Sequence, residues 1–292
     1  MSVWQFTGQG SQFLNMGTEH LGNQIFKKHW DLCHKIALKS NIDLHSLISN
    51  ADQIHQTQYS QPLIFAYEYA LGMSMIDSST APKCLIGHSI GEYAAYVIAQ
   101  MIDLETALQL IILRGKLIGS LPQNHSGMLA VIGSQEKTLA ALNQMKDIDL
   151  AAINHEKQIV ASGPLPHLTK AKDDFKSIGI KSIMLNVSHG FHSHCMDHIL
   201  DEFYEGVEKI LMHSQHPKIQ IISTTTGLPL ESLTATYLKN HIRQPVQYWP
   251  VIQELVKQHD TFIEIGPKPI LTKLLQKEPI KAQWKQAEVT VE

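Results

Sequence analysis

A serine between two glycines carries the clearest chemical signal in the chain. The segment Gly87-His88-Ser89-Ile90-Gly91 follows a short apolar run and leads into an alanine-rich helical pattern. A sharp turn from strand into helix needs torsions that a Cβ resists, so these glycines let the two elements pack closely while the Ser89 hydroxyl projects outward. At the start of the helix, the free N–H of Ile90 can stabilise a developing oxyanion. The pattern predicts a nucleophile elbow, although serine is also favoured as an ordinary helix cap.

A serine hydroxyl becomes a good nucleophile only when a base removes its proton, so the elbow needs a histidine. The chain has 17 histidines, and residues 187–197 hold His189, His192 and His194 within six positions. His192 is the first candidate, with His189 and His194 as alternatives. His88 directly precedes the serine, but neighbouring residues at an elbow point in different directions, which favours a structural role for it.

Four further motifs accompany the elbow. They are Gly8-Gln9-Gly10-Ser11-Gln12, Leu113-Arg114-Gly115-Lys116, Gly190-Phe191-His192-Ser193 and Glu264-Ile265-Gly266-Pro267. Together with Gly-His-Ser-Ile-Gly-Glu-Tyr they resemble, in order, the signatures of malonyl-CoA:acyl carrier protein transacylases and polyketide-synthase acyltransferases. The resemblance covers nearly the whole chain, and five motifs in order are far more specific than any one of them. It implies Ser89 as the nucleophile and His192 as the base, because the family's catalytic histidine directly follows the aromatic residue.

A third group usually fixes the tautomer of a catalytic histidine. The resemblance implies a carbonyl or amide oxygen shortly before a Pro-Val pair, which in this chain is Pro245-Val246. The Asn or Gln that the family usually has four residues before the proline is His241 here. We therefore expect His241 or its neighbour Asn240 to orient His192, with a backbone carbonyl of this segment as the alternative.

Arg114 indicates the substrate. It follows the otherwise apolar helical pattern of residues 107–113, and a guanidinium is expensive to bury unless an anion meets it. Its planar fork matches a carboxylate with two hydrogen bonds, and the resemblance implies that the carboxylate is that of malonyl. The alternative is an arginine at a helix end that contacts solvent or carbonyl groups.

Five more residues complete the predicted site. Gln9 lies in a glycine-rich loop, from which its backbone N–H and its amide can approach the reacting carbonyl as a second source of oxyanion donors. Without a following Lys-Ser/Thr pair, this loop is a weak candidate for phosphate binding. The resemblance implies that Phe191 favours malonyl by crowding the α-carbon, and that Gln61 and Asn154 line the cleft. His88, beside the serine, joins this substrate-binding set.

The order of predicted elements indicates an α/β protein of two parts. Strand patterns at 3–6 and 84–86 and helical patterns at 63–75, 91–101 and 104–117 predict a parallel sheet with the elbow at its carboxyl edge. The next segment has the strand-helix-strand-strand-helix-strand order of a ferredoxin-like domain. Its strands are expected at 127–133, 150–154, 158–162 and 180–185, and its helices at 136–145 and 166–178. We expect an α/β-hydrolase-like large domain (1–123 and 188–292), an inserted ferredoxin-like subdomain (124–187) and an active site between them.

Composition excludes several classes of protein. The chain has 292 residues, 43% of them hydrophobic, which is enough for a substantial core. A net charge of −3 without a long Lys/Arg block argues against nucleic-acid binding, and no apolar run reaches the roughly 20 residues that cross a membrane. Cys33, Cys84 and Cys195 are odd in number and widely spaced, which favours free thiols over disulfides or a metal site. The N-terminus lacks the pattern of a signal peptide, so we expect a cytoplasmic protein.

The expected function is transfer of a malonyl group from malonyl-CoA, through an ester on Ser89, to the phosphopantetheine thiol of an acyl carrier protein. No cofactor of its own is expected, and the kinetics should be ping-pong. Because the chain ends shortly after Gly266-Pro267, we expect it to meet its carrier in trans, in polyketide or fatty-acid synthesis, and the Phe-His-Ser form favours the former. One alternative is an acyl hydrolase that clears carrier proteins, which would not need Arg114. The other is a non-catalytic module that docks carriers, which would not need Ser89 and His192.

Overall fold

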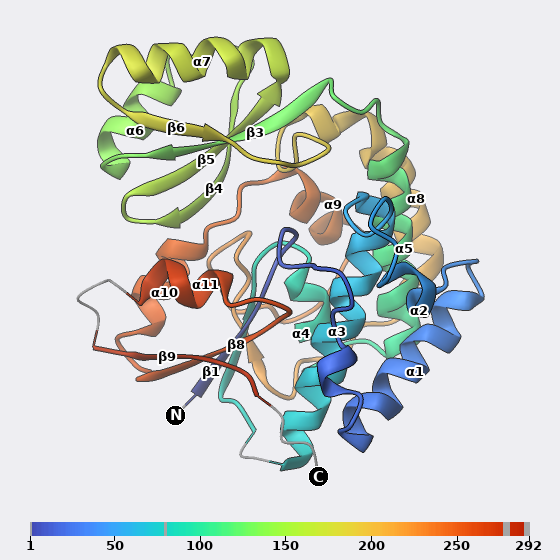
Figure 1. Ribbon diagram of the computed structural model, residues 1–292. Helices are drawn as coiled ribbons and strands as arrows, with labels where there is room; N and C mark the ends of the chain where they lie inside the picture. The colour runs from blue at the N-terminus through green and yellow to red at the C-terminus, as the bar shows by residue number, and fades with distance from the viewer. Residues whose placement is uncertain (1, 79–80, 277–280, 289–292) are drawn as a thin grey trace.

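A five-stranded parallel sheet forms the centre of the larger part of the molecule (Figure 1). The computed structural model describes residues 2–78, 81–276 and 281–288. In sheet order the strands are β7 (Gln220–Ile221), β2 (Cys84–Gly87), β1 (Ser2–Phe6), β8 (Thr261–Ile265) and β9 (Gln283–Gln286). β1 pairs with β2 on one side and with β8 on the other. Apolar segments from the two ends of the chain therefore share one buried core.

The helices on one side of this sheet bring the predicted site residues together. They are α1 (Gln24–Leu38), α2 (Leu44–Leu47), α3 (Thr57–Ser78), α4 (Gly91–Ile98), α5 (Leu104–Ser120), α8 (Leu200–Ile210) and α9 (Ala235–Arg243). α4 packs on β1 and β2, and α3 packs against α1, α4 and α5. Because α3 is enclosed by other helices, its residues 60–72 are buried without a break, as expected of a helix that is apolar on all faces.

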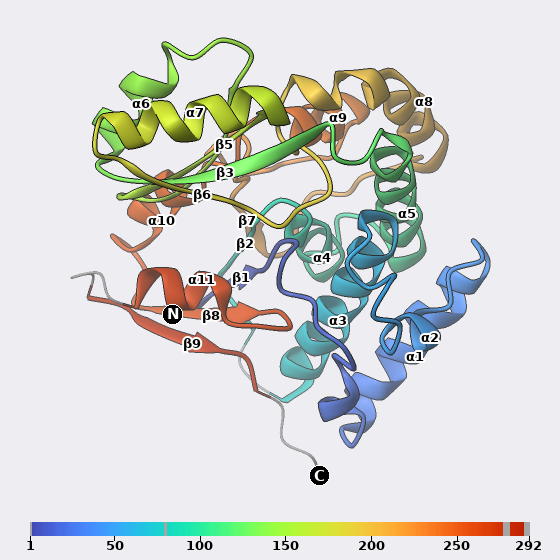
Figure 2. The same cartoon turned by 45° about the horizontal axis from the view of Figure 1, so that its top comes forward.

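The smaller part is a four-stranded antiparallel sheet with two helices. Its strands lie in the order β4 (Asp149–His155), β5 (Gln158–Pro164), β3 (Ser126–Ile132) and β6 (Lys181–Met184). α6 (Gln135–Leu142) and α7 (Leu165–Ser177) cover the face of the sheet turned away from the larger part (Figure 2). Since successive strand residues face opposite sides, Gly127 and Leu129 face the helices and Met128 faces the larger part.

The predicted α/β class and the ferredoxin-like order of the smaller part are confirmed. The helix expected over 91–101 is shorter, because it ends at Ile98 and Gln100 then adopts a left-handed φ of 61°. Two further helices, α10 (Tyr248–Leu255) and α11 (Ile270–Leu275), lie near the junction of the two parts. Within the described ranges, we find no helix with the length and apolar character to cross a membrane.

Candidate active site

Ser89 lies at the turn between β2 and α4 and has a positive φ of 52°. A Cβ at Gly87 would lie 2.1 Å from the backbone nitrogen of Glu92, and a Cβ at Gly91 would lie 2.4 Å from the carbonyl oxygen of Thr7. No side chain fits at either glycine without moving backbone. The two glycines therefore allow the helix to start directly against the sheet, in the geometry of a nucleophile elbow.

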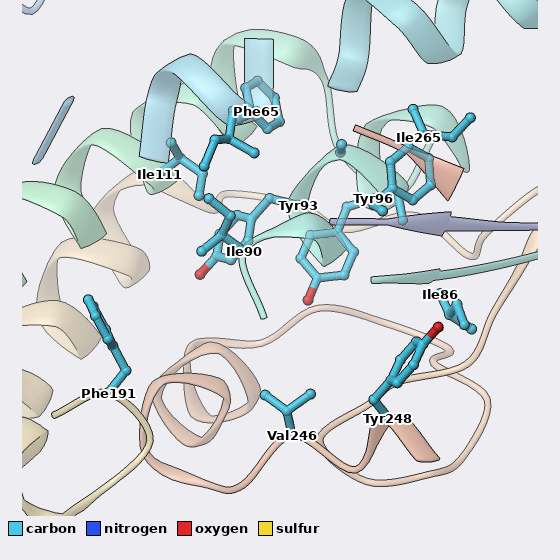
Figure 3. Close-up of a cluster of buried hydrophobic side chains, with 14 of the residues drawn as sticks. Phe65, Ile86, Ile90, Tyr93, Tyr96, Ile111, Phe191, Val246, Tyr248 and Ile265 are labelled. Atoms are coloured by element: carbon cyan, nitrogen blue, oxygen red, sulfur yellow. The ribbon is translucent and has the colours of Figure 1, made fainter. Parts of the chain in front are cut away.

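The helix behind the elbow is anchored in the core. Ile90 and Tyr93 are buried and lie in an apolar cluster with Phe65 of α3 and Ile111 of α5 (Figure 3). Glu92 is also fully buried, and its carboxylate accepts hydrogen bonds from the hydroxyls of tyrosine and threonine side chains and from one backbone N–H. These contacts hold the strained turn, since a strained residue persists only where its surroundings fix it.

His192 is placed to act as the base for Ser89. Its Nε2 lies 2.8 Å from Ser89 Oγ, and its Nδ1 lies 2.8 Å from the carbonyl oxygen of Gln244. A carbonyl can only accept a hydrogen bond, so Nδ1 carries the proton and Nε2 is left to accept the proton of the serine hydroxyl. This is the tautomer that a general base needs.

The other candidate histidines are engaged elsewhere. His189 Nε2 lies 3.1 Å from the carbonyl oxygen of Leu121, and His194 Nδ1 lies 2.8 Å from a carboxylate oxygen of Asp149. Of the three, the structure brings only His192 to the nucleophile.

The predictions that Asn240 or His241 orients His192 are wrong. Asn240 is exposed on α9, and the His241 ring meets the His192 ring edge-on at 6.5 Å. The orienting group is the Gln244 carbonyl, because the residue before a proline avoids the helical conformation. Gln244 has φ −80° and ψ 155°, so α9 stops before it and its carbonyl oxygen is free to face the imidazole.

Arg114 reaches the nucleophile from α5. It is buried, with one guanidinium nitrogen 3.2 Å from Ser89 Oγ and another 2.6 Å from the amide oxygen of Gln61. Gln61 in turn donates to the Thr57 hydroxyl at 2.7 Å. Among the described residues, Arg114 has no carboxylate within ion-pair distance, and its Nε has no hydrogen-bond partner. The site thus holds a buried cation without a protein anion.

A cavity of about 360 Å³ opens in front of the pair, between the two parts of the molecule. Met128 and Val160 of the small sheet and Leu271 and Leu274 of α11 give it apolar walls. None of its described lining residues is Lys, Arg, Asp or Glu. Arg114 is therefore the cation that lies beside the catalytic end of an otherwise uncharged cavity.

Three of the five predicted substrate-binding residues line this cavity, whereas Arg114 and Gln61 lie outside its lining. Phe191, His88 and Asn154 line it, and His88 Nε2 lies 2.8 Å from the amide oxygen of Asn154, so one hydrogen bond joins the two parts. Phe191 and Val246 approach the elbow from two other segments (Figure 3). Gln61 is fully buried behind the nucleophile. Its predicted place in the cleft lining is wrong, because its amide oxygen accepts from Arg114.

The predicted oxyanion donors comprise one side-chain amide and two backbone N–H groups, and the role of the backbone groups stays a prediction. The Gln9 amide donates to the hydroxyls of Thr57 at 3.2 Å and Ser60 at 3.0 Å, so the prediction that it faces the reacting carbonyl is wrong. The backbone N–H groups of Gln9 and Ile90 donate no hydrogen bond within the described part of the chain, and both residues lie beside Ser89. We keep these two N–H groups as the candidate oxyanion hole.

Acylation should stay fast well below the pH at which an ordinary histidine loses its basicity. Burial first, and then the Arg114 guanidinium, lower the pKa of His192 to about 3, against the opposing effect of the Gln244 carbonyl. The imidazole is inactive when protonated, so activity is lost only as the pH falls through this lowered pKa. At pH 5 an imidazole with the usual pKa of about 6.5 would be roughly 97% protonated. Single-turnover acylation between pH 4.5 and 8 checks this, and an acid limb centred near pH 6.5 would contradict it.

The chain matches known proteins along nearly its whole length. Residues 3–291 match the acyl transferase domain family. The polyketide biosynthesis malonyl CoA-acyl carrier protein transacylase PksC of Bacillus subtilis is 32% identical over 286 residues, which is 95% of this chain and 96% of that protein. The orsellinic acid synthase ArmB of Armillaria ostoyae is 31% identical over 296 residues, but the chain spans only 13% of its length.

The fold agrees with this match. The crystal structure of FabD from Acinetobacter baumannii superposes with a TM-score of 0.91 at 26% identity, covering 98% of this chain and 93% of that one. The family match, a relative of almost equal length and the shared fold all coincide with a serine and histidine in hydrogen-bond contact at an elbow. The chain therefore belongs to the acyl transferase family that includes the PksC transacylase.

Proposed function

We propose that this chain moves a malonyl group from malonyl-CoA to the phosphopantetheine thiol of an acyl carrier protein. Arg114 is the observation that carries the proposal. A buried cation with no protein anion beside it is costly, and this one lies 3.2 Å from the atom to which the acyl group would be attached. The free carboxylate of a malonyl ester on Ser89 is an anion of the right reach to meet it.

The first half-reaction makes the ester. His192 Nε2 takes the proton of Ser89 as Oγ bonds to the thioester carbonyl carbon. The negative charge that develops on the carbonyl oxygen is met by the backbone N–H groups of Gln9 and Ile90. The carbon–sulfur bond then breaks, and the imidazolium returns its proton to the departing thiolate of coenzyme A.

The second half-reaction repeats these steps with a different nucleophile. The phosphopantetheine thiol gives its proton to His192 and attacks the ester carbonyl, and Ser89 leaves with that proton. Both halves need a neutral imidazole at rest, which agrees with the lowered pKa of His192. No bound cofactor or metal takes part in this scheme, and we propose that none is needed.

PksC, a relative of almost equal length, is a polyketide biosynthesis malonyl CoA-acyl carrier protein transacylase, which supports transfer to a carrier protein in polyketide biosynthesis. A hydrolase that clears carrier proteins would need no cation for a malonyl carboxylate, and a docking module would need no serine–histidine contact. We therefore favour the transferase over both alternatives. We also propose that the protein is located in the cytoplasm.

Replacing Arg114 by alanine tests the proposal. Hydrogen bonds to a charged group contribute about 1.5–3 kcal/mol each, so losing two of them should lower kcat/KM for malonyl-CoA by roughly two to four orders of magnitude. Acetyl-CoA has no carboxylate to lose and should be affected far less. The measured quantity is the ratio of the two losses, in which a general loss of stability cancels.

Lys116→Ala is the matched control for this experiment. Lys116 lies two residues later on the same helix and is exposed, so its removal should leave both substrates unchanged. Equal losses with malonyl-CoA and acetyl-CoA in Arg114→Ala would show that Arg114 is structural, and would favour the hydrolase.

A further inference from the structure

We infer that Asp149, the first residue of β4, is a positioning residue that keeps His192 in its working orientation through contacts with His194 and Arg243. The inference builds on the Ser89–His192 chemistry proposed above. Asp149 belongs to the small subdomain, whereas His192 lies outside it, so the small subdomain would help to position the base.

The first contact of Asp149 is to the loop that bears the base. One Asp149 carboxylate oxygen accepts the backbone N–H of His194 at 2.6 Å and lies 2.8 Å from His194 Nδ1. His192, two residues earlier, has a left-handed φ of 56°. A residue other than glycine adopts this conformation only where its surroundings impose it. The Asp149 carboxylate is one such restraint, and the Ser193 hydroxyl bond to the Gly190 carbonyl at 2.6 Å is another.

The second contact of Asp149 is to the segment that orients the base. The same carboxylate oxygen lies 3.6 Å from a guanidinium nitrogen of Arg243, whose Nε donates to Asp197 at 2.7 Å. Arg243 directly precedes Gln244, whose carbonyl accepts the Nδ1–H of His192. One carboxylate of the small subdomain thus restrains both the loop of the base and the carbonyl that fixes its tautomer.

Backbone pairing extends the same connection. Val246 donates to the Ala151 carbonyl at 2.9 Å, and Ile153 donates to the Val246 carbonyl at 2.9 Å. The segment that follows Gln244 is therefore joined to β4 by one parallel bridge, between Val246 and Ala152. Asp149 is the first residue of β4. A movement of the small subdomain would therefore move the Gln244 carbonyl and the loop that bears His192 together.

Because Asp149 is partly exposed, its effect on the orientation of His192 can be distinguished from its effect on the stability of the fold. Its side chain is 30% exposed, and that of Arg243 is 28% exposed. Ion pairs so accessible to water contribute little to folding. Removing the carboxylate should therefore change the orientation of His192 much more than it changes the melting temperature.

Two substitutions, Asp149→Ala and Asp149→Asn, test the inference. In Asp149→Ala, the rate at which a fluorophosphonate labels Ser89 and kcat with malonyl-CoA should both fall about tenfold or more, as expected for the loss of charge-assisted hydrogen bonds. KM and the melting temperature should stay close to those of the unchanged protein. The labelling rate and kcat of Asp149→Asn should lie between those of Asp149→Ala and those of the unchanged protein, since the remaining side-chain oxygen can still accept the His194 N–H.

Asp147→Asn is the matched control. Asp147 is in the same subdomain and also faces a histidine, His167, at 3.7 Å, but among the described contacts it has none with His194 or Arg243. In Asp147→Asn, the rate at which the fluorophosphonate labels Ser89 should be unchanged. Nitrogen-15 spectra of histidine-labelled protein, assigned with His192→Gln, should show the Nδ1–H signal of His192 shifted in Asp149→Ala and unshifted in Asp147→Asn.

The outcomes distinguish this inference from the proposed function. Equal labelling rates and an unshifted His192 signal in both Asp149 variants would overturn the positioning role. A protein that the fluorophosphonate labels but malonyl-CoA does not acylate would refute the proposed function, while the labelling and the spectra would still decide the role of Asp149. If Asp149→Ala does not fold, the isosteric Asp149→Asn decides alone, with a reduced labelling rate supporting the role.

Discussion

Replacing Ser89 by alanine should abolish the covalent malonyl adduct. The unchanged protein, mixed with malonyl-CoA, should gain the mass of one malonyl group, because a single hydroxyl lies 2.8 Å from the neutral nitrogen of the base. Alanine removes only the oxygen, and the turn already holds a residue other than glycine at positive φ. The fold should therefore persist while the adduct disappears. Intact-protein mass spectrometry with peptide mapping measures this.

Cys195→Ser is the control for the adduct. Cys195 is a partly exposed free thiol three residues after the base, so it is the thiol nearest to the base along the chain. Its replacement should leave the adduct on Ser89 intact. An adduct that survives in Ser89→Ala, or that maps to Cys195, would show that the elbow serine is not the nucleophile.

Replacing His192 by alanine should slow acylation by about 10²–10⁴-fold, the usual contribution of a positioned general base. Without the imidazole, the serine keeps its proton and must lose it to water in a largely apolar cavity. Single-turnover acylation followed by mass spectrometry measures the rate, and circular dichroism checks that the fold remains.

His189→Ala is the comparison that tests this assignment. His189 is buried in the same loop, but its ring lies against the Leu121 carbonyl and not against the serine. It should lose much less activity. If His189→Ala or His194→Ala slowed acylation as strongly and His192→Ala did not, another histidine would be the base.

The features that could be predicted from the sequence are those with a local cause. A side chain at Gly87 is excluded by Glu92 within the turn itself, so the elbow is visible in a few residues, although Gly91 also makes room for the distant Thr7. The small sheet could be predicted because β3, β4 and β5 have seven residues each, which is long enough to show a period. By contrast, β7 has only two residues and so has no period that the sequence reveals.

The features that were missed depend on contacts between distant segments. A backbone carbonyl has no side-chain signature, so the sequence offered a carbonyl of the segment before Pro245 only as an alternative, and the structure identifies it as that of Gln244. The sequence also does not show which way a glutamine side-chain amide points. Gln9 turns to Thr57 and Ser60, and Gln61 turns to Arg114, because those partners are brought near by the packing of α3. Asp149 and His194 are 45 residues apart, so their contact could not be foreseen from spacing.

A pulse-chase experiment tests the central claim most directly. The protein is first loaded with isotopically labelled malonyl-CoA, freed of excess substrate, and then mixed with a phosphopantetheine-bearing acyl carrier protein. The account predicts that the label leaves Ser89 and appears as a thioester on the carrier faster than it appears as free malonate. Release of the label as free malonate at the same rate with and without the carrier would contradict the account, because it would show hydrolysis instead of transfer.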